Sequence, residues 1–194
     1  MIRAVVFDFD GTLVPSNHVK KKILTQHFSE LVFDNQRAIE LISAGNLNRY
    51  QIFDEISSDM KRCKITKDIF FAKLNIALEE AICQLPLRGD AMSCLTELRD
   101  KGIGMYLSSA TPHVNLVNIV NKKALTGFFS KINGSPTSKI NFIHELLDDG
   151  ILQSEIIIFG DGIDDEESAN ICSVQFCSAL SDNSFDELLR LVIK

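Results

Sequence analysis

Two aspartates stand two positions apart near the start of the chain, directly behind a run of apolar residues. They lie in the segment VVFDFDGTLV, residues 5–14, where Asp8 and Asp10 are followed by Gly11 and Thr12. Two carboxylates at the end of a buried strand repel each other and lower stability unless a cation or a proton neutralises them. One such carboxylate can act as a nucleophile while the other moves protons, provided that a metal offsets their repulsion.

Two further segments place polar residues after an apolar run, SSATP at 108–112 and GDGIDDEE at 160–167. Between them lies GSPTSK at 134–139, which brings Lys139 in front of a predicted helix. Carboxylates without histidine or thiol partners suit Mg²⁺, which prefers oxygen ligands. A lysine, a serine and backbone N–H groups beside that metal suit a phosphoryl group. Together the segments predict a magnesium site that handles a phosphate ester.

These segments can meet if the chain forms a parallel sheet, because ligands bind beyond the carboxyl ends of parallel strands at the switch point in strand order. Short, unalternating runs rich in β-branched residues are typical of strands covered on both faces. They predict strands at 2–7, 103–107, 155–159 and 174–177, with a shorter one at about 130–133. Apolar stripes with helical spacing occur at 91–98, 140–147 and 185–192. This alternation predicts an α/β fold with a parallel sheet and right-handed crossovers.

The stretch from residue 16 to residue 84 has a different pattern. Helical spacing predicts helices at 23–31, about 50–60 and 70–81, and no convincing strand pattern occurs. We expect a helical insertion that forms a small cap on an α/β core made of residues 1–15 and 85–194. Proline and glycine punctuate chains, so Pro15 and the segment LPLRG at 85–89 are the expected hinges.

Composition limits the function classes. The chain has 194 residues, 45% of them hydrophobic and 24% charged, which suits one globular domain with a small insertion. The net charge of −6 disfavours nucleic acid as a partner. No apolar stretch approaches the roughly 20 residues that cross a bilayer, and no leader precedes the first strand, so a cytoplasmic protein is expected. The odd cysteine count without a CxxC pair favours reduced, buried thiols at Cys63, Cys83, Cys94, Cys172 and Cys177.

The segments FDFDGTLV, YLSSATP, GSPTSK and FGDGIDDEESA resemble, in order, the four motifs of the haloacid dehalogenase-like (HAD) hydrolase superfamily. The resemblance extends from residue 2 to about residue 177. It implies a Rossmann-like parallel sheet core and Mg²⁺ as cofactor. The insertion directly after the first motif is similar to the superfamily's C1 caps, as in phosphoglycolate phosphatase-like members.

The resemblance also implies roles for the catalytic residues. Asp8 would attack phosphorus and form an aspartyl-phosphate. Asp10 would protonate the leaving oxygen and later deprotonate the hydrolytic water. Ser109 and Lys139 would hold the transferring phosphoryl group, and Lys139 would also offset the charge of Asp8. An acid at the position of Asp10 resembles the phosphoryl-transfer branch rather than the dehalogenases.

The remaining implied positions bind phosphate or metal. Phosphate-binding positions are Gly11, Thr12 and Ala110 beside Ser109 and Lys139, and metal-binding positions are Asp8, the carbonyl of Asp10, Asp161 and Asp165. Two of these assignments stay open, because Ser108 is an alternative to Ser109 and Asp164 is an alternative to Asp165. The proline three positions after Ser109 favours Ser109, and the spacing of four residues from Asp161 favours Asp165.

The insertion contains one candidate substrate-binding residue. In AGNLNRYQIF, residues 44–53, Arg49 follows a Gly-Asn turn and resembles a pattern found in some C1-capped phosphatases. A guanidinium on the cap could bind an anionic group of the substrate. The alternative is a surface arginine next to a packed Tyr50 and Phe53.

We therefore expect a Mg²⁺-dependent phosphatase that hydrolyses a small phosphomonoester, such as a sugar phosphate, while the cap excludes bulk water. The nearest alternative is a phosphomutase of the β-phosphoglucomutase kind. An alternative of another class is a catalytically silent binding or regulatory domain, whose usual mark, a lost nucleophile, acid or metal ligand, is not found here. A receiver-like phosphoacceptor is disfavoured by the cap and by Asp10. The physiological substrate and the oligomeric state stay open.

Overall fold

The computed structural model describes residues 1–33, 35–44, 47–59 and 65–193. The chain divides into two compact units. The core unit comprises Met1–Pro15 and Leu85–Lys194, and the helical unit comprises Ser16–Gln84. The boundaries between the two units fall after Pro15 and before the LPLRG segment at residues 85–89.

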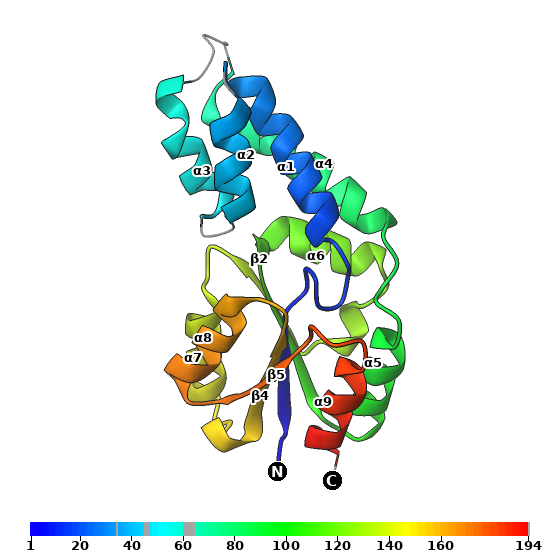
Figure 1. Cartoon of the computed structure of the whole chain (residues 1–194). Coiled ribbons are helices and arrows are strands. Elements are labelled where there is room, and N and C mark those ends of the chain that lie inside the picture. The colour runs from blue at the N-terminus through cyan, green and yellow to red at the C-terminus, as the bar shows by residue number, and fades with distance from the viewer. Residues whose placement is uncertain (34, 45–46, 60–64, 194) are drawn as a thin grey trace. The chain divides into compact units, whose positions relative to one another are not determined.

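Within its described residues, the core unit contains a five-stranded parallel sheet (Figure 1). The strand order is β3-β2-β1-β4-β5. The strands are β1 (Ala4–Phe7), β2 (Gly104–Pro112), β3 (Lys131–Ser135), β4 (Ile156–Gly160) and β5 (Gln175–Ser178). The predicted α/β fold is confirmed, and each of the five predicted strands is present.

Strand β1 lies at the centre of the sheet because all four of its residues, AVVF, are apolar and buried. It pairs in parallel with β2 on one side and β4 on the other. The chain moves outward from β1 through β2 to β3, and from β4 to β5 in the opposite direction. The switch in strand order therefore lies between β1 and β4, where α/β sheets bind their ligands.

Helices cover both faces of this sheet. In chain order they are α5 (Ala91–Asp100), α6 (His113–Lys122), α7 (Lys139–Asp148), α8 (Ile163–Cys172) and α9 (Ser184–Val192), with short 3₁₀ turns at η2 (Thr126–Phe128) and η3 (Gln153–Glu155). Helices α7 and α8 pack together on one face, and α5 and α9 pack together on the other (Figure 1). The three predicted stripes form α5, α7 and α9, and their apolar residues are buried.

The helical unit forms its own apolar core. Its described elements are α1 (Asn17–Leu31), α2 (Asn35–Ala44), α3 (Arg49–Glu55), η1 (Ser57–Asp59) and α4 (Lys67–Gln84). In this core, edge-on and tilted ring contacts join Phe28, Phe53, Phe70 and Phe71. Helix α2 was not predicted, because only two of its ten residues are buried. The predicted helix at about 50–60 is shorter in the structure and ends at Glu55, while residue 60 lies outside the described residues.

In the part of the chain that the structure describes, no helix has the length and apolar character required to cross a membrane.

Candidate active site

A tight turn after β1 carries the first two acids. The backbone N–H of Asp8 still donates to the carbonyl of Phe159 on β4, at 2.9 Å. Gly11 then takes a φ of +86°, a region that favours glycine, and its N–H donates to the Val14 carbonyl at 2.7 Å. The turn therefore leaves the Asp8 and Asp10 carboxylates at the carboxyl end of the central strand.

Strand β2 carries the hydroxyl groups of the second segment. The sequence pattern ended this strand at Leu107, but in the structure it continues to Pro112, so the prediction of its end was wrong. The extension arises because Ser109 still pairs with Gly134 on β3, after which the register shifts and Pro112 pairs with Ser135. Residues 110 and 111 form a bulge between these pairs.

Lys139 is the first residue of α7 and is buried, with 9% of its surface exposed. Its Nζ lies 3.4 Å from Oδ1 of Asp8 and directly contacts Oδ1 of Asp165. The hydroxyl of Ser138 caps this helix by accepting from the N–H of Asn141 at 3.2 Å. The helix start thus holds an ammonium group between two buried carboxylates.

The end of β4 supplies two further acids. Thr12 Oγ1 donates to Oδ1 of Asp161 at 2.9 Å and so links the turn after β1 to the turn after β4. Oδ2 of Asp165 accepts from the N–H of Gly162 at 2.9 Å. A side chain at position 160 would collide with the Asp165 carboxylate, so glycine is required there.

The geometry distinguishes between the neighbouring residues that were alternatives at two positions of the site. Ser109 Oγ lies 3.3 Å from Asp10 Oδ2, whereas Ser108 Oγ accepts from the amide of Asn133 at 3.0 Å. The side chain of Asp165 is 2% exposed, whereas that of Asp164 is 73% exposed and lies 3.7 Å from the Lys139 ammonium. The arrangement therefore favours Ser109 and Asp165.

Three carboxylates gather where a metal is expected. Carboxylate oxygens of Asp8, Asp161 and Asp165 all lie within 4.8 Å of one another. The set offers only oxygen donors, which is the chemistry that Mg²⁺ prefers. These residues therefore fit the predicted ion.

Burial raises the pKa of Asp8 from 3.8 to about 6. The ammonium of Lys139 opposes this shift, whereas the negative charges of Asp10, Asp161 and Asp164 add to it. One lysine therefore does not compensate the acids, and an additional cation would stabilise the ionised site.

The raised pKa predicts how stability depends on pH without metal. In EDTA the folded protein holds the Asp8 proton more tightly than the unfolded chain, so the free energy of unfolding falls as pH rises from about 4 to about 6. The contribution is about 3 kcal/mol by pH 7. Urea unfolding across this range should show the loss in the wild type and a smaller one in Asp8→Asn, and added Mg²⁺ should reduce it. Equal pH slopes for the two proteins would contradict the assignment.

Replacing Lys139 by methionine tests the buried ion cluster. The change leaves Asp8 and Asp165 without their ammonium partner, and we expect the free energy of unfolding to fall by about 3–5 kcal/mol. Lys131→Met is the control, because Lys131 pairs with Asp149 at 2.6 Å in an exposed position and should contribute less than about 1 kcal/mol. Urea unfolding in EDTA measures the free energy of unfolding of both variants. Similar losses would show that the buried ion cluster contributes no more to stability than an exposed ion pair.

Arg49 belongs to the helical unit, whereas the other predicted site residues belong to the core unit. It is the first residue of α3, which Asn48 caps through a capping box with Gln51. The Arg49 guanidinium donates to Asn75 Oδ1 at 2.7 Å and lies over the Tyr50 ring, 5.6 Å from its centre. The Gly-Asn turn invoked in the sequence analysis, residues 45–46, lies outside the described residues.

Two residues that the sequence analysis did not select contact this site. Thr111 Oγ1 donates to Oδ2 of Asp10 at 2.7 Å. It stands within the second motif, but the bulge that directs it at Asp10 has no signature in the surrounding residues. The predicted phosphate-binding residue Ala110 lies next to it in the bulge and is exposed.

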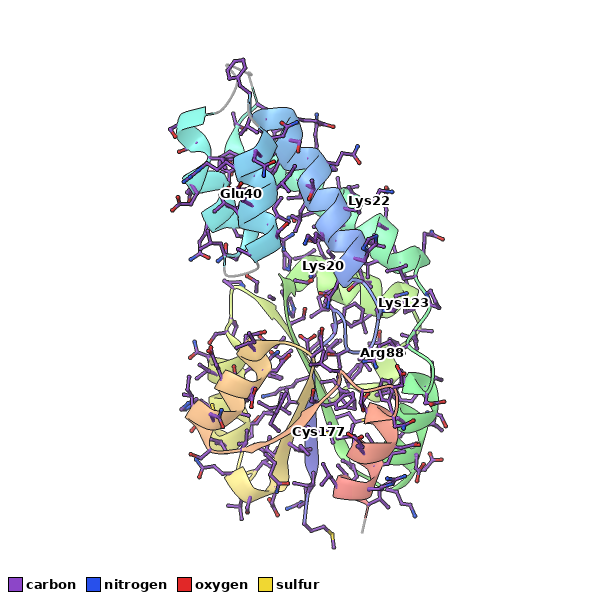
Figure 2. The ribbon with its side chains drawn as sticks, in the orientation of Figure 1. Lys20, Lys22, Glu40, Arg88, Lys123 and Cys177 are labelled. Atoms are coloured by element: carbon purple, nitrogen blue, oxygen red, sulfur yellow. The ribbon has the colours of Figure 1, made fainter. Side chains whose placement is uncertain are left out.

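The second unselected residue is Arg88, labelled in Figure 2, in the segment that leads into α5. Its Nη1 donates to the carbonyls of Gly11 at 3.3 Å, Thr12 at 3.4 Å and Ala179 at 2.6 Å. The backbone N–H of Arg88 donates to the carbonyl of Leu13 at 2.9 Å. Arg88 therefore ties the turn after β1 to the segment after β5.

A comparison with protein families finds a match over most of this chain. A family model described as haloacid dehalogenase-like hydrolase matches residues 5–179. No curated protein matches the chain significantly in sequence.

Solved structures share the fold. CbbY from Rhodobacter sphaeroides, crystallised with xylulose-1,5-bisphosphate, has a TM-score of 0.73 at 13% identity, covering 92% of this chain and 86% of its own. A HAD hydrolase of family IA, variant 3, from Entamoeba histolytica has a TM-score of 0.74 at 18% identity, covering 97% and 89%. A candidate β-phosphoglucomutase from Thermotoga maritima has a TM-score of 0.69 at 13% identity, covering 98% and 100%.

Proposed function

This chain belongs to the haloacid dehalogenase-like hydrolase family and is an enzyme, and from that premise we propose that it is a Mg²⁺-dependent phosphatase of small phosphomonoesters, such as sugar phosphates. The observation that carries the proposal is the pairing of Asp8 and Asp10 at the switch point, with Lys139 3.4 Å from Asp8. A nucleophilic carboxylate, a second acid and a fixed cation are the groups that phosphoryl transfer through an enzyme-bound ester requires.

In the first step, a carboxylate oxygen of Asp8 attacks phosphorus while the bond to the leaving oxygen breaks. Asp10 donates its proton to that oxygen, so the substrate leaves as an alcohol. Lys139 and the Ser109 hydroxyl bind the phosphoryl oxygens. The carboxylates of Asp8, Asp161 and Asp165 and the carbonyl of Asp10 would hold Mg²⁺, which when bound offsets the negative charge of the carboxylates and of the phosphoryl group.

In the second step, water attacks the phosphorus of the aspartyl-phosphate. Asp10, now ionised, takes a proton from that water, and the bond between phosphorus and the Asp8 oxygen breaks. Inorganic phosphate leaves, and both carboxylates return to their starting state. We assign the helical unit the role of a C1-type cap that excludes bulk water and selects the substrate.

A β-phosphoglucomutase-like mutase is the second candidate, supported by the similarity of fold to the candidate Thermotoga enzyme. It would use the same residues but return the phosphoryl group to another hydroxyl. A bisphosphate should activate a mutase, which would release little inorganic phosphate.

Phosphate release across a panel of sugar phosphates, nucleotides, phosphoglycolate and amino-acid phosphates tests the proposal. Each compound is measured with Mg²⁺ and with EDTA. We expect metal-dependent release from at least one ester. Isomerised product without phosphate release, in the presence of a bisphosphate, would favour the mutase, and neither activity would contradict both.

Arg49 is the proposed contact to an anionic group of the substrate remote from the reacting phosphate. Replacing it by alanine should raise KM for the best ester of the panel by about tenfold or more, the value of a hydrogen bond to a charged group. KM for 4-nitrophenyl phosphate should change little. Arg37→Ala is the control, because Arg37 lies in the same unit and pairs with Glu55 in an exposed position. Equal changes of KM with both substrates would show that Arg49 has a structural role and does not bind the substrate.

We place the enzyme in the cytoplasm, where thiols stay reduced. Cys94 and Cys177 are buried free thiols, which suits a compartment that keeps thiols reduced (Figure 2 labels Cys177). Residue Cys63 lies outside the described residues. The proposed partner is a small-molecule phosphate ester.

A further inference from the structure

We infer that Thr111 is a positioning residue for the acid and base of this reaction, and that its hydroxyl fixes one oxygen of Asp10 so that the transferred proton resides on the other. The inference rests on the proposed phosphatase function, in which Asp10 protonates the leaving group. It adds a residue that neither the sequence motifs nor the comparisons assign.

The hydrogen bond from Thr111 to Asp10 is short, and its donor residue is buried. Thr111 Oγ1 donates to Asp10 Oδ2 at 2.7 Å, and Thr111 is only 6% exposed. Ser109 Oγ lies 3.3 Å from the same oxygen, and the N–H of Thr111 donates to Ser109 Oγ at 3.1 Å. Two hydroxyls therefore converge on one carboxylate oxygen, and the nearer belongs to Thr111.

The bulge in β2 produces this convergence. The pairing of β2 with β3 passes from Ser109 opposite Gly134 to Pro112 opposite Ser135, so residues 110 and 111 have no partner of their own on β3. The bulge closes because position 134 is glycine. A Cβ at that position would approach the Thr111 carbonyl to 2.7 Å and the His113 Cα to 2.5 Å. Bulges near active sites commonly redirect a side chain, and here the redirected side chain is Thr111.

The contact fixes where the proton of Asp10 resides. The terminal torsion of an aspartate side chain is broad, so a carboxylate needs a partner to hold one orientation. An oxygen that accepts from a hydroxyl disfavours a proton of its own, so a proton on Asp10 would reside on Oδ1. Ser109 cannot provide this constraint throughout the reaction, because in the proposed mechanism its hydroxyl turns to the phosphoryl group. Of these two hydroxyls, Thr111 is therefore the one that stays on Asp10 when substrate binds.

The test compares two esters whose leaving groups differ in their need for a proton. The unactivated ester is the best alkyl phosphate of the panel, and the activated one is 4-nitrophenyl phosphate, whose leaving group departs as a stable anion. In Thr111→Val, which keeps the shape and removes the hydroxyl, we expect kcat/KM to fall by about 10- to 100-fold with the alkyl ester, because the lost hydrogen bond is to a carboxyl group that becomes charged as it gives up its proton. The fall with the activated ester should stay below about threefold.

Thr111→Ser keeps the hydroxyl and should restore kcat/KM for the alkyl ester to within about threefold of the wild type. Thr111→Ala repeats the comparison with a smaller side chain, in case valine does not fit. Thr96→Val is the control, because that hydroxyl bonds only the Met92 carbonyl within α5 among the contacts described for it. The increase in melting temperature on adding Mg²⁺ should be the same in every variant, because Thr111 is not a proposed metal ligand.

Equal losses with both esters in the valine and alanine variants, or no recovery in the serine variant, would overturn the inference and leave Thr111 a structural residue. Failure of the proposed function has a different signature. It would show as a wild-type protein that releases no phosphate from either ester, or as Asp8→Asn protein that releases as much as the wild type.

Discussion

Asp8→Asn protein should release inorganic phosphate at least about a thousandfold more slowly than the wild type, because loss of a covalent nucleophile removes the enzyme-bound intermediate. The amide has nearly the size of the carboxylate but is neutral and does not attack phosphorus. The fold should persist. Asp8 is buried among other acids, so its replacement by a neutral group should leave the metal-free protein at least as stable at pH 7.

Three measurements separate this expectation from a folding defect. Phosphate release gives the loss of activity, circular dichroism reports the fold, and urea unfolding in EDTA gives stability. Asp100→Asn is a matched control, because this aspartate is 65% exposed and pairs only with its neighbour Arg99 among the ion pairs described. Activity of Asp8→Asn above a tenth of the wild-type value would exclude Asp8 as the nucleophile.

Asp10→Asn should affect two steps that can be observed separately. Without the acid, kcat/KM for an alkyl phosphate should fall by about 10²- to 10⁴-fold, the usual contribution of a general acid. With 4-nitrophenyl phosphate the leaving group needs no proton, so Asp8 should still be phosphorylated. The second step lacks its base, and the aspartyl-phosphate should accumulate.

Stopped-flow mixing with 4-nitrophenyl phosphate should therefore show a burst of nitrophenolate in Asp10→Asn, equal to about one per active site, followed by slow turnover. Asp8→Asn is the negative control and should show no burst. Mass spectrometry of the burst sample should find one added phosphoryl group. A uniform loss with both esters and no burst would contradict the assignment of Asp10 as both acid and base.

The sheet could be predicted because residues adjacent in the sequence are enough to mark its central strand. Strand β1 is a run of buried apolar residues, and the acids that follow it need no distant partner to be recognised. Helix α6 was not anticipated, although it begins at His113 directly after the polar segment of β2. The expected end of β2 at Leu107 was wrong because its continuation depends on Gly134, which the chain reaches 25 residues after Ser109.

Part of the candidate site could also be predicted from the sequence. Acids and lysine at strand ends and helix starts are recognised by type and order, and the structure gathers Asp8, Asp161, Asp165 and Lys139 at one edge of the sheet. Arg88 gave no such signal. Its acceptors are backbone carbonyls from distant segments, and every residue type has a carbonyl, so the sequence does not indicate which ones an arginine will reach.

The central position of β1 has a consequence for how the enzyme is made. Ala4 pairs with Gly104, about 100 residues later, and with Ile156, about 150 residues later. Contacts that distant in sequence slow folding, because a long loop must close before they form. Strand β1 precedes both of its partner strands along the chain, so during synthesis it has no partner strand until the whole helical unit has followed it. The proposed catalytic centre is therefore complete only after β4 has been synthesised, although its proposed nucleophile, Asp8, lies directly after β1.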